Sequence, residues 1–346
     1  MKVCIITVHD IVNCGSYWQA YALGKKCEEL GADVYYLKRN IFKKIIYRIK
    51  NYIKYIYVMI FRNFSLGVNR FKTDFIFRKS QKKFKEVNFP IKDSLLIIGS
   101  DTLWNINDYY FKKNYKIYFG CKFNNFSKIT YAISAANVNY NELIKIDNVS
   151  DYINNFDAIS VRDKNTKEIS KKIYKGNVIE VCDPTLLFCK SDYEKFVSFT
   201  DPKYKYVYLY LFDKLNENQI KCIKEFATKK GLKIVDGIGK NNWSDLTVSN
   251  TPNNFINHIY FSDYVITDTF HGTVFSTNFN KEFIVINQNK NKVNEFLKKY
   301  NLSNRLICND NLNGIFKEKI NYELINKILE KNRKESELFL AKYVKK

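Results

Sequence analysis

Short apolar runs alternate along the chain with longer segments whose apolar residues recur at helical spacing. Such runs are typical of strands buried in a parallel sheet. In the first half, the predicted strands cover residues 2–8, 33–37, 95–98, 129–134, 158–161 and 178–181. Helical patterns fall between several of them, at 16–30, 140–153 and 164–173. The alternation predicts one domain built on a parallel β-sheet.

The same alternation restarts after a polar stretch at 189–205. The strands predicted there are 207–212, 233–235, 264–267, 283–286 and 305–308, and the helices are 217–230, 253–261 and 293–300. We therefore predict an α/β fold with two doubly wound, Rossmann-like domains, residues 1–190 and 203–320, that face a cleft. A C-terminal helix over 321–346 is expected to cross back over the first domain.

The composition narrows the class of protein. With 46% hydrophobic and 27% charged residues in 346, the chain has the make-up of a globular protein. Its eight cysteines form no CxxC pair, which favours reduced thiols in the cytoplasm and no metal site. Neither GxGxxG nor GxxxxGK[ST] occurs, which argues against nicotinamide, flavin and nucleoside triphosphate sites. The start of the chain lacks a signal-peptide pattern, and no run reaches the roughly 20 apolar residues of a spanning helix.

The net charge of +22 is concentrated in one region. Residues 41–90 hold thirteen basic and two acidic side chains, a net of 13 − 2 = +11. Within the helical insertion at 41–85, isoleucine, tyrosine and phenylalanine recur at helical spacing among lysines and arginines. This pattern fits a helix at the inner face of an anionic membrane, but it also fits a helix packed on the domain with its lysines in solvent. Nucleic acid is not expected as a partner, because no recognised motif accompanies the charge.

A histidine stands where the second domain turns from strand to helix. His271 follows the strand at 264–267, with Asp268 and Thr269 as capping residues and Gly272 leaving the backbone open to close approach. The start of a helix attracts anions and favours neutral imidazole. The alternative is that His271 only caps or packs.

Three further segments follow predicted strand ends. In HDIVNCGSYWQAYAL, Asn13, Gly15 and Ser16 form a turn into a helix that can offer amide groups to an anion or a sugar hydroxyl. In IIGSDTLWN, Asp101 follows a Gly-Ser turn, and Trp104 is available to stack on a sugar ring. Asp101 can equally serve as a helix cap.

The last of these segments is AISVRD, which places Arg162 at the mouth of the first sheet. A guanidinium group binds carboxylate or phosphate with two parallel hydrogen bonds. Pairing with Asp163 or another acid of the chain is the alternative.

Together these segments resemble the motifs of the polysaccharide pyruvyl transferase family. The family patterns NxGSxLQAYAL, GSDxxWN, ISVRxK and DSFHGTxFSxxFNKPF correspond here to residues 13–23, 99–105, 159–164 and 268–283, in that order. The resemblance implies a two-domain fold similar to glycosyltransferase-B. It also implies transfer of a carboxyethylidene (pyruvyl) group from phosphoenolpyruvate to two hydroxyls of a sugar or lipid-linked oligosaccharide, in cell-surface polysaccharide biosynthesis. Phosphoenolpyruvate would be a substrate, with no other cofactor.

The resemblance also suggests roles for residues. The expected catalytic residues are His271 and Asp101; the donor would contact Arg162, Thr269, Gly272, Thr273 and Arg305, and the acceptor Asn13, Gly15, Ser16 and Trp104. Some family members have an arginine at the position of Thr269. Either another cation, Arg305 or Lys281, replaces it here, or the donor differs.

Two other functions remain open. A glycosyltransferase of the same fold would use a nucleotide sugar, but the EX7E arrangement of many retaining enzymes is absent after Glu282, since no glutamate stands at Asn289 or at the position that follows it. A non-catalytic protein of polysaccharide assembly would use the basic helix as an anchor.

Overall fold

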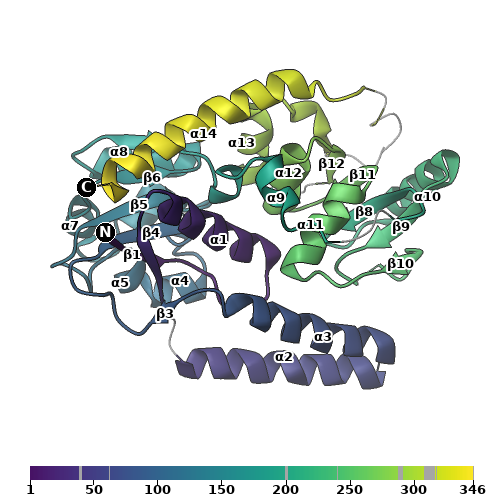
Figure 1. The fold of residues 1–346 in the computed structure, drawn as a ribbon, viewed down its shortest axis with the longest axis horizontal. Helices are drawn as coiled ribbons and strands as arrows, with labels where there is room; N and C mark the ends of the chain where they lie inside the picture. The colour runs from purple at the N-terminus through teal and green to yellow at the C-terminus, as the bar shows by residue number, and fades with distance from the viewer. Residues whose placement is uncertain are drawn as a thin grey trace.

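Two parallel β-sheets with their helices form the body of the molecule (Figure 1), which confirms the predicted fold class. The computed structural model describes residues 1–38, 41–61, 63–198, 202–239, 241–286, 291–307, 316 and 318–345. Arg62, Asn289 and Cys308, which entered the sequence predictions, lie outside these ranges.

The first sheet has seven strands in the order β3-β2-β1-β4-β5-β6-β7, and neighbouring strands pair in parallel. The strands are β1 Lys2–Ile6, β2 Asp33–Leu37, β3 Glu86–Val87, β4 Leu95–Asp101, β5 Lys128–Ile133, β6 Ile159–Val161 and β7 Val178–Glu180. The chain reverses its direction of winding between β1 and β4. Open α/β sheets bind ligands at the carboxyl ends of the strands beside such a switch point.

The second sheet has six strands in the order β10-β9-β8-β11-β12-β13, also in parallel. The strands are β8 Tyr206–Tyr210, β9 Lys233–Asp236, β10 Leu246–Thr247, β11 Tyr264–Thr267, β12 Glu282–Ile286 and β13 Leu306–Ile307. Its switch point lies between β8 and β11. Residues that follow β1, β4 and β11 are therefore the first candidates for a site.

Helices connect the strands of both sheets. Around the first sheet these are α1 Cys14–Glu29, α4 Tyr109–Lys113, α5 Tyr115–Tyr118, α6 Tyr140–Leu143, α7 Val149–Asn154, α8 Lys164–Ile173, the 3-10 turn η1 Pro184–Leu186 and α9 Lys190–Glu194. Around the second they are α10 Glu217–Lys230, α11 Pro252–Phe261, α12 Phe270–Asn278, α13 Asn291–Lys299 and the turn η2 Ser303–Arg305. The helix predicted at 140–153 is divided in two, because Asn148 adopts a left-handed backbone conformation with φ of 58° between α6 and α7.

An apolar core continues from one sheet to the other through α1. The indole nitrogen of Trp18 donates a hydrogen bond to the carbonyl oxygen of Pro252, in α11, at 2.9 Å. The Trp18 ring packs on Phe196 at 4.9 Å between ring centres, and Tyr193 meets Phe275 of α12 at 5.0 Å. Because this interface is apolar and buried, it fixes the two halves of the cleft relative to each other.

The last helix, α14 Tyr322–Val344, runs from the second sheet back to the first along one side of the molecule (Figure 1). Near its start Tyr322 donates a hydrogen bond to the carbonyl oxygen of Lys281. Farther along, the Ser336 hydroxyl accepts a hydrogen bond from the Cys182 amide at 2.8 Å, and the Phe339 ring lies 6.4 Å from that of Tyr131. The crossing expected from the sequence is present.

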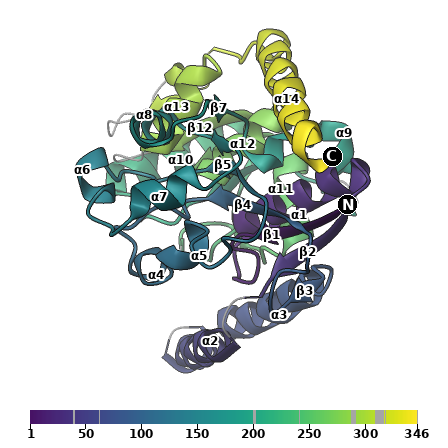
Figure 2. The same ribbon diagram turned by 90° about the vertical axis from the view of Figure 1, so that its left-hand side faces the viewer.

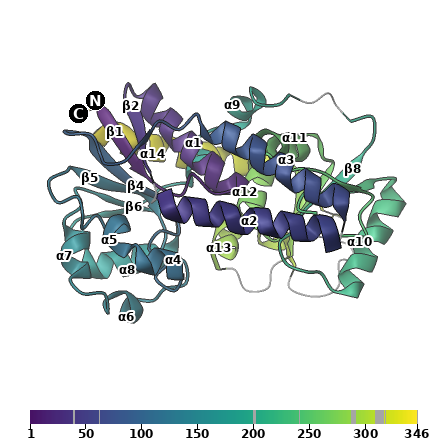
Figure 3. The same cartoon turned by 90° about the horizontal axis from the view of Figure 1, so that it is seen from below.

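The basic insertion forms a hairpin of two long helices, α2 Ile41–Phe61 and α3 Phe64–Gln81. Asn63 begins α3 by accepting a hydrogen bond from the Leu66 amide at 2.9 Å. The hairpin projects from one side of the molecule, with α2 as its outermost element (Figures 2 and 3). Among the helices that the structure describes, none is both long and apolar enough to cross a bilayer.

Candidate active site

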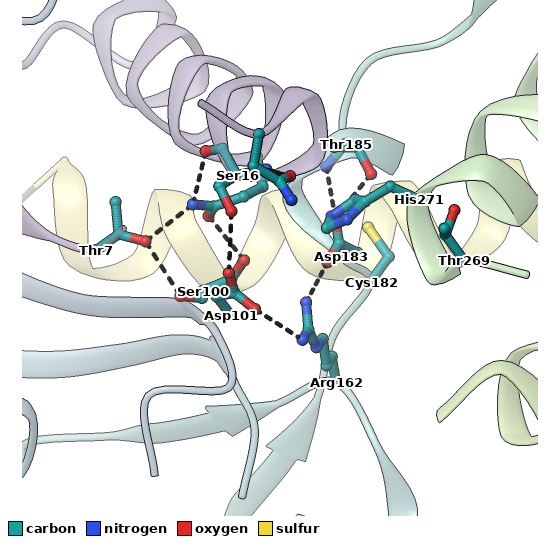
Figure 4. Close-up of polar contacts among 12 residues, drawn as sticks. Thr7, Ser16, Ser100, Asp101, Arg162, Cys182, Asp183, Thr185, Thr269 and His271 are labelled. Atoms are coloured by element: carbon teal, nitrogen blue, oxygen red, sulfur yellow. Dashed lines mark hydrogen bonds and ion pairs between the residues drawn. The ribbon is translucent and has the colours of Figure 1, made fainter. Parts of the chain in front are cut away.

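Four polar side chains from different segments meet at the carboxyl ends of the two sheets (Figure 4). Asp101 ends β4, Arg162 follows β6, Asp183 follows β7, and His271 stands in the first turn of α12. The strand order brings them together, because all of these segments leave their parallel sheets at the edge that faces the cleft.

Arg162 links the two aspartates. Its Nη1 donates to Oδ2 of Asp183 at 2.7 Å, and its Nη2 lies 3.4 Å from Oδ1 of Asp101. The guanidinium is 3% exposed and lies 5.0 Å from the ring centre of Phe270. Asp163 does not pair with it in this way, since its carboxylate caps α8 through the amide of Thr166. Arg162 therefore holds two carboxylates of the chain itself.

Both carboxylates stay ionised. Burial by itself would raise the pKa of Asp101, but the charges of Arg162 and Lys292 hold it below its ordinary value. For Asp183, burial again opposes ionisation, and the charge of Arg162 and two hydrogen bonds from Thr185 outweigh it and lower the pKa. Neither group can act as an acid at neutral pH.

His271 is the neutral member of the group. Burial lowers its pKa below the ordinary value for histidine, and Arg162 and Lys292 lower it further, against the opposing effect of the two aspartates. Its Nε2 is buried, lies 3.9 Å from Oδ1 of Asp183 and has no hydrogen-bond partner among the residues that the structure describes. The side chain is 15% exposed. A proton gained by this imidazole would be stabilised by a neighbouring carboxylate.

Gly15 determines how close α1 comes to this histidine. A Cβ atom added at Gly15 would overlap the imidazole of His271, with Nδ1 as its nearest atom. The first turns of α1 and α12 therefore face each other with only a glycine between them. Both turns carry amide groups without an acceptor inside the helix and the positive end of a helix dipole.

Gly15→Ala is expected to displace His271 and to lower catalytic turnover by about 10–100-fold, since small misplacements of a reacting group have effects of this size. The fold should persist, because alanine suits a helix better than glycine does. Steady-state kinetics with urea unfolding checks both statements. Gly231→Asn is a matched control, since an added Cβ there meets nothing within 4 Å and asparagine accepts a left-handed conformation. Unchanged turnover in Gly15→Ala would contradict the contact.

Hydrogen bonds join the start of α1, which holds Ser16, to the end of β4, which holds Asp101. The Gln19 side-chain amide donates to the Thr7 hydroxyl at 3.0 Å and to the Ser16 carbonyl at 3.0 Å, and accepts from the Ser100 hydroxyl at 2.9 Å. Ser16 Oγ in turn lies 3.4 Å from Oδ2 of Asp101. Asp101 adopts φ of 85°, a conformation rare for a non-glycine residue. The network holds this carboxylate toward the cleft.

Several expected ligand-binding groups are occupied by helix capping. The side chain of Asn13 accepts from the Ser16 amide at 3.0 Å and caps α1. Thr269 caps α12, accepting at its hydroxyl from the Gly272 amide at 2.8 Å and at its carbonyl from the Thr273 amide at 3.1 Å. The amides of Gly272 and Thr273 are therefore not available to bind the donor substrate. The amides of Phe270 and His271 precede the capped positions in the same turn, where a helix offers them no acceptor of its own.

Three expected site residues lie elsewhere. Trp104 is fully buried, stacks on Phe119 at 5.0 Å and donates to the Tyr118 carbonyl, so it cannot stack on a sugar. Arg305 is buried against Glu282, and Lys281 donates to the carbonyl of Ser262. Both basic residues precede strands, which places them at the opposite edge of the second sheet from His271. They are not the cation that replaces an arginine at Thr269.

Two site residues were missed from the sequence. Asp183 stands three residues after the end of β7 and precedes Pro184, a position at the edge of the sheet that could have singled it out. Lys292, at the start of α13, places its ammonium 5.9 Å from the ring centre of Phe270, and its charge acts on Asp101 and His271. No group of three His, Cys, Asp or Glu side chains within the described ranges is arranged to hold a metal ion.

The family of the chain follows from comparison with known proteins. The family model named polysaccharide pyruvyl transferase matches residues 13–290, a range that contains Gly15, Asp101, Arg162, Asp183 and His271. The chain belongs to the polysaccharide pyruvyl transferase family. No curated protein matches this family member by sequence.

Solved structures similar to this pyruvyl transferase family member share its fold. The MnaA–UDP complex of S. aureus aligns with a TM-score of 0.51 at 12% identity, over 91% of this chain and 86% of that one. The UDP-GlcNAc 2-epimerase of Neisseria meningitidis bound to UDP-GlcNAc aligns with a TM-score of 0.50 at 10% identity, over 97% and 94%. At this identity the likeness shows a glycosyltransferase-B-like fold and does not transfer a substrate.

Proposed function

We propose that this transferase moves a pyruvyl group from phosphoenolpyruvate to two hydroxyls of a sugar, forming a ketal and releasing phosphate during cell-surface polysaccharide assembly. One observation carries the proposal. In a chain of this family, a neutral histidine lies beside a buried Asp101–Arg162–Asp183 chain at the cleft edge of both sheets. A neutral base next to a fixed carboxylate suits the removal of a proton from a hydroxyl group.

The reaction requires two protons to leave the sugar and one to reach the donor. The first hydroxyl gives its proton to Nδ1 of His271, beside Gly15, and its oxygen bonds to C2 of phosphoenolpyruvate. As that C2–O bond forms, the imidazolium, facing Asp183 through Nε2, delivers the proton to the methylene carbon; the electron pair of the C2=C3 double bond becomes the new C–H bond, and the carbon becomes a methyl group. The second hydroxyl oxygen displaces phosphate from C2, and its proton leaves on the phosphate. Atoms and charges balance without an oxidant.

The anionic donor would lie beside the first turns of α1 and α12, at the edge of their contact. Their amide groups, including those of Phe270 and His271, supply hydrogen bonds to phosphate or carboxylate oxygens. Lys292 supplies the positive charge near this point, in place of the arginine that some family members have at the position of Thr269. Arg162 acts through the carboxylates that it orients, because its hydrogen bonds to them already use both terminal nitrogens.

The acceptor would contact the first domain. Asp101 presents an ionised carboxylate that is 17% exposed and suited to accept hydrogen bonds from a sugar hydroxyl. Ser16 lies beside it, 3.4 Å away. Asn13, two residues before Gly15, lines a cavity of about 180 Å³ that continues from this turn toward α3 and the second sheet.

Phosphate release from phosphoenolpyruvate, measured with a panel of free and lipid-linked sugars, tests the proposal. Thermal unfolding with each candidate donor accompanies it, since a ligand at about 100 times its Kd stabilises the folded state by about 2.7 kcal/mol. Stabilisation by phosphoenolpyruvate together with phosphate release supports pyruvyl transfer. Stabilisation by a nucleotide sugar alone would indicate a glycosyltransferase. If neither ligand stabilises the protein, the result would indicate a non-catalytic protein. Both of these results contradict the proposal.

A further inference from the structure

The outward face of α2 exposes a continuous row of apolar side chains. Of the 22 exposed large hydrophobic residues in the part of the chain that the structure describes, nine lie on this one helix. The row consists of Ile46, Ile49, Ile53, Ile56, Tyr57 and Ile60. Their spacing of three and four residues places them on a single face, and Ile53 and Ile60 are 62% and 68% exposed. A face of this kind is unusual unless it meets a partner.

The inward face of α2 packs against α3 and attaches the helix to the molecule. Tyr55 and Val58 are buried, and Tyr55 lies 5.2 Å from the ring centre of Phe71 in α3. Seen from below, α2 is the element nearest the viewer, with α3 behind it (Figure 3). The apolar row is therefore not needed to attach the hairpin to the rest of the molecule.

The charge of the helix indicates the chemistry of its partner. In the sequence, α2 has five basic residues and no acidic one: Lys43, Lys44, Arg48, Lys50 and Lys54. Lys50 and Lys54 are exposed and follow one border of the apolar row. Apolar side chains bordered by lysine are suited to the region between the headgroups and acyl chains of an anionic bilayer.

We propose that α2 lies in the surface of an anionic membrane, with its isoleucine row toward the acyl chains. A second copy of the chain would be a poorer partner. In a symmetric dimer the same surface meets itself, so the exposed Lys50 and Lys54 would lie near their copies, and the sequence of α2 has no acidic residue to offset them. Anionic headgroups have the complementary charge.

This placement bears on the acceptor, a step that rests on the proposed function. The cavity of about 180 Å³ is lined by Tyr55 of α2 and by Asn69 and Thr73 of α3, together with Tyr210 and Asn250 of the second sheet and its loops. One helix diameter, about 10 Å, separates the outward row from Tyr55. A sugar linked to a membrane lipid would reach this cavity and the adjoining Asn13 turn without leaving the bilayer surface. The geometry points to a lipid-linked acceptor.

Cosedimentation with vesicles tests the membrane contact without any substrate. The protein is expected to bind vesicles of phosphatidylglycerol and phosphatidylcholine, and to bind less as salt is raised. The double variant Ile53→Glu, Ile60→Glu should bind at least about tenfold more weakly, since charged residues replace the two most exposed isoleucines of the row. Leu338→Glu is the matched control, because Leu338 is 70% exposed on α14 and should leave binding unchanged.

Thermal unfolding of the double variant should match that of the parent protein, since both positions are exposed. Its phosphate release with a free sugar should also be unchanged, while release with a lipid-linked sugar in anionic vesicles should fall. Equal vesicle binding by variant and parent, or no binding by either, overturns the proposal. So does a dimer in solution that the double variant separates. A failure of phosphoenolpyruvate as donor would leave the vesicle result intact, so the two proposals can be judged separately.

Discussion

Replacing His271 with asparagine is expected to slow phosphate release from phosphoenolpyruvate by about 10²–10⁴-fold, the usual contribution of general acid–base catalysis. Asparagine keeps a polar side chain between Gly15 and Asp183 but cannot carry a proton between the sugar hydroxyl and the methylene carbon. Donor binding, followed by thermal unfolding, should be retained. Lys327→Ala, an exposed change on α14, serves as the control and should leave turnover unaffected.

The pH dependence gives the same residue a second test. Because the pKa of His271 is lowered, the neutral form persists below the ordinary histidine value of about 6.5. Activity should therefore hold as the pH falls through about 6.5 and decline only below it. Between the two pKa values the unfolded chain binds a proton that the folded protein does not, so the free energy of unfolding decreases as the pH is lowered through that interval. The His271→Asn protein should lose both dependences; an unchanged profile would assign them to another group.

Arg162→Ala is expected to lower the free energy of unfolding by about 3–5 kcal/mol, because it leaves the carboxylates of Asp101 and Asp183 in the interior without their shared cation. The pKa of both carboxyls should rise, since the charge of Arg162 is what offsets their burial. Catalytic turnover should fall as well, because the two acids no longer have fixed positions. Urea unfolding over a range of pH measures the first effect, and phosphate release the last.

A double-mutant cycle separates this ion-pair effect from a simple loss of packing. Asp183→Asn in the Arg162→Ala background removes one of the uncompensated charges, so the double variant should be less destabilised than the sum of the single changes. Additive effects would mean that Arg162 contributes through its contact with Phe270 rather than through its charge. Arg162→Lys should lie between the parent and Arg162→Ala, because a single ammonium cannot bridge both carboxylates in the same way.

Much of this site could be anticipated from strand direction. Gly15, Ser16, Asp101, Arg162 and His271 all follow segments that the apolar pattern identified as parallel strands, and residues after such strands meet at one edge. The same rule excludes Arg305 and Lys281 from the site. Both stand directly before strands and therefore lie at the amino-terminal edge of the second sheet. Applied to the strand at 178–181, the rule would also have singled out Asp183. These outcomes depend on local pattern and topology alone.

Other features depend on tertiary structure that no pattern expresses. Trp104 and Asp101 come from one short segment, yet the carboxylate faces the cleft while the indole turns into the core against Phe119. Lys292 stands in a lysine-rich stretch, and only the position of α13 in the fold brings it near His271. The sequence also does not show which amides of the first turn of α12 are left to bind a ligand. That depends on the cap, and here the Thr269 hydroxyl accepts from the Gly272 amide.

The return of α14 to the first sheet also affects how the protein folds during synthesis. The contacts of Ser336 with Cys182 and of Phe339 with Tyr131 cover a part of the first sheet that would otherwise be open. Its apolar surface therefore stays uncovered until more than 300 residues have left the ribosome, since α14 begins at Tyr322. Domains that fold in order from the N-terminus do not have this constraint. The first domain can begin to form early, but its contacts with α14 are the last to be made.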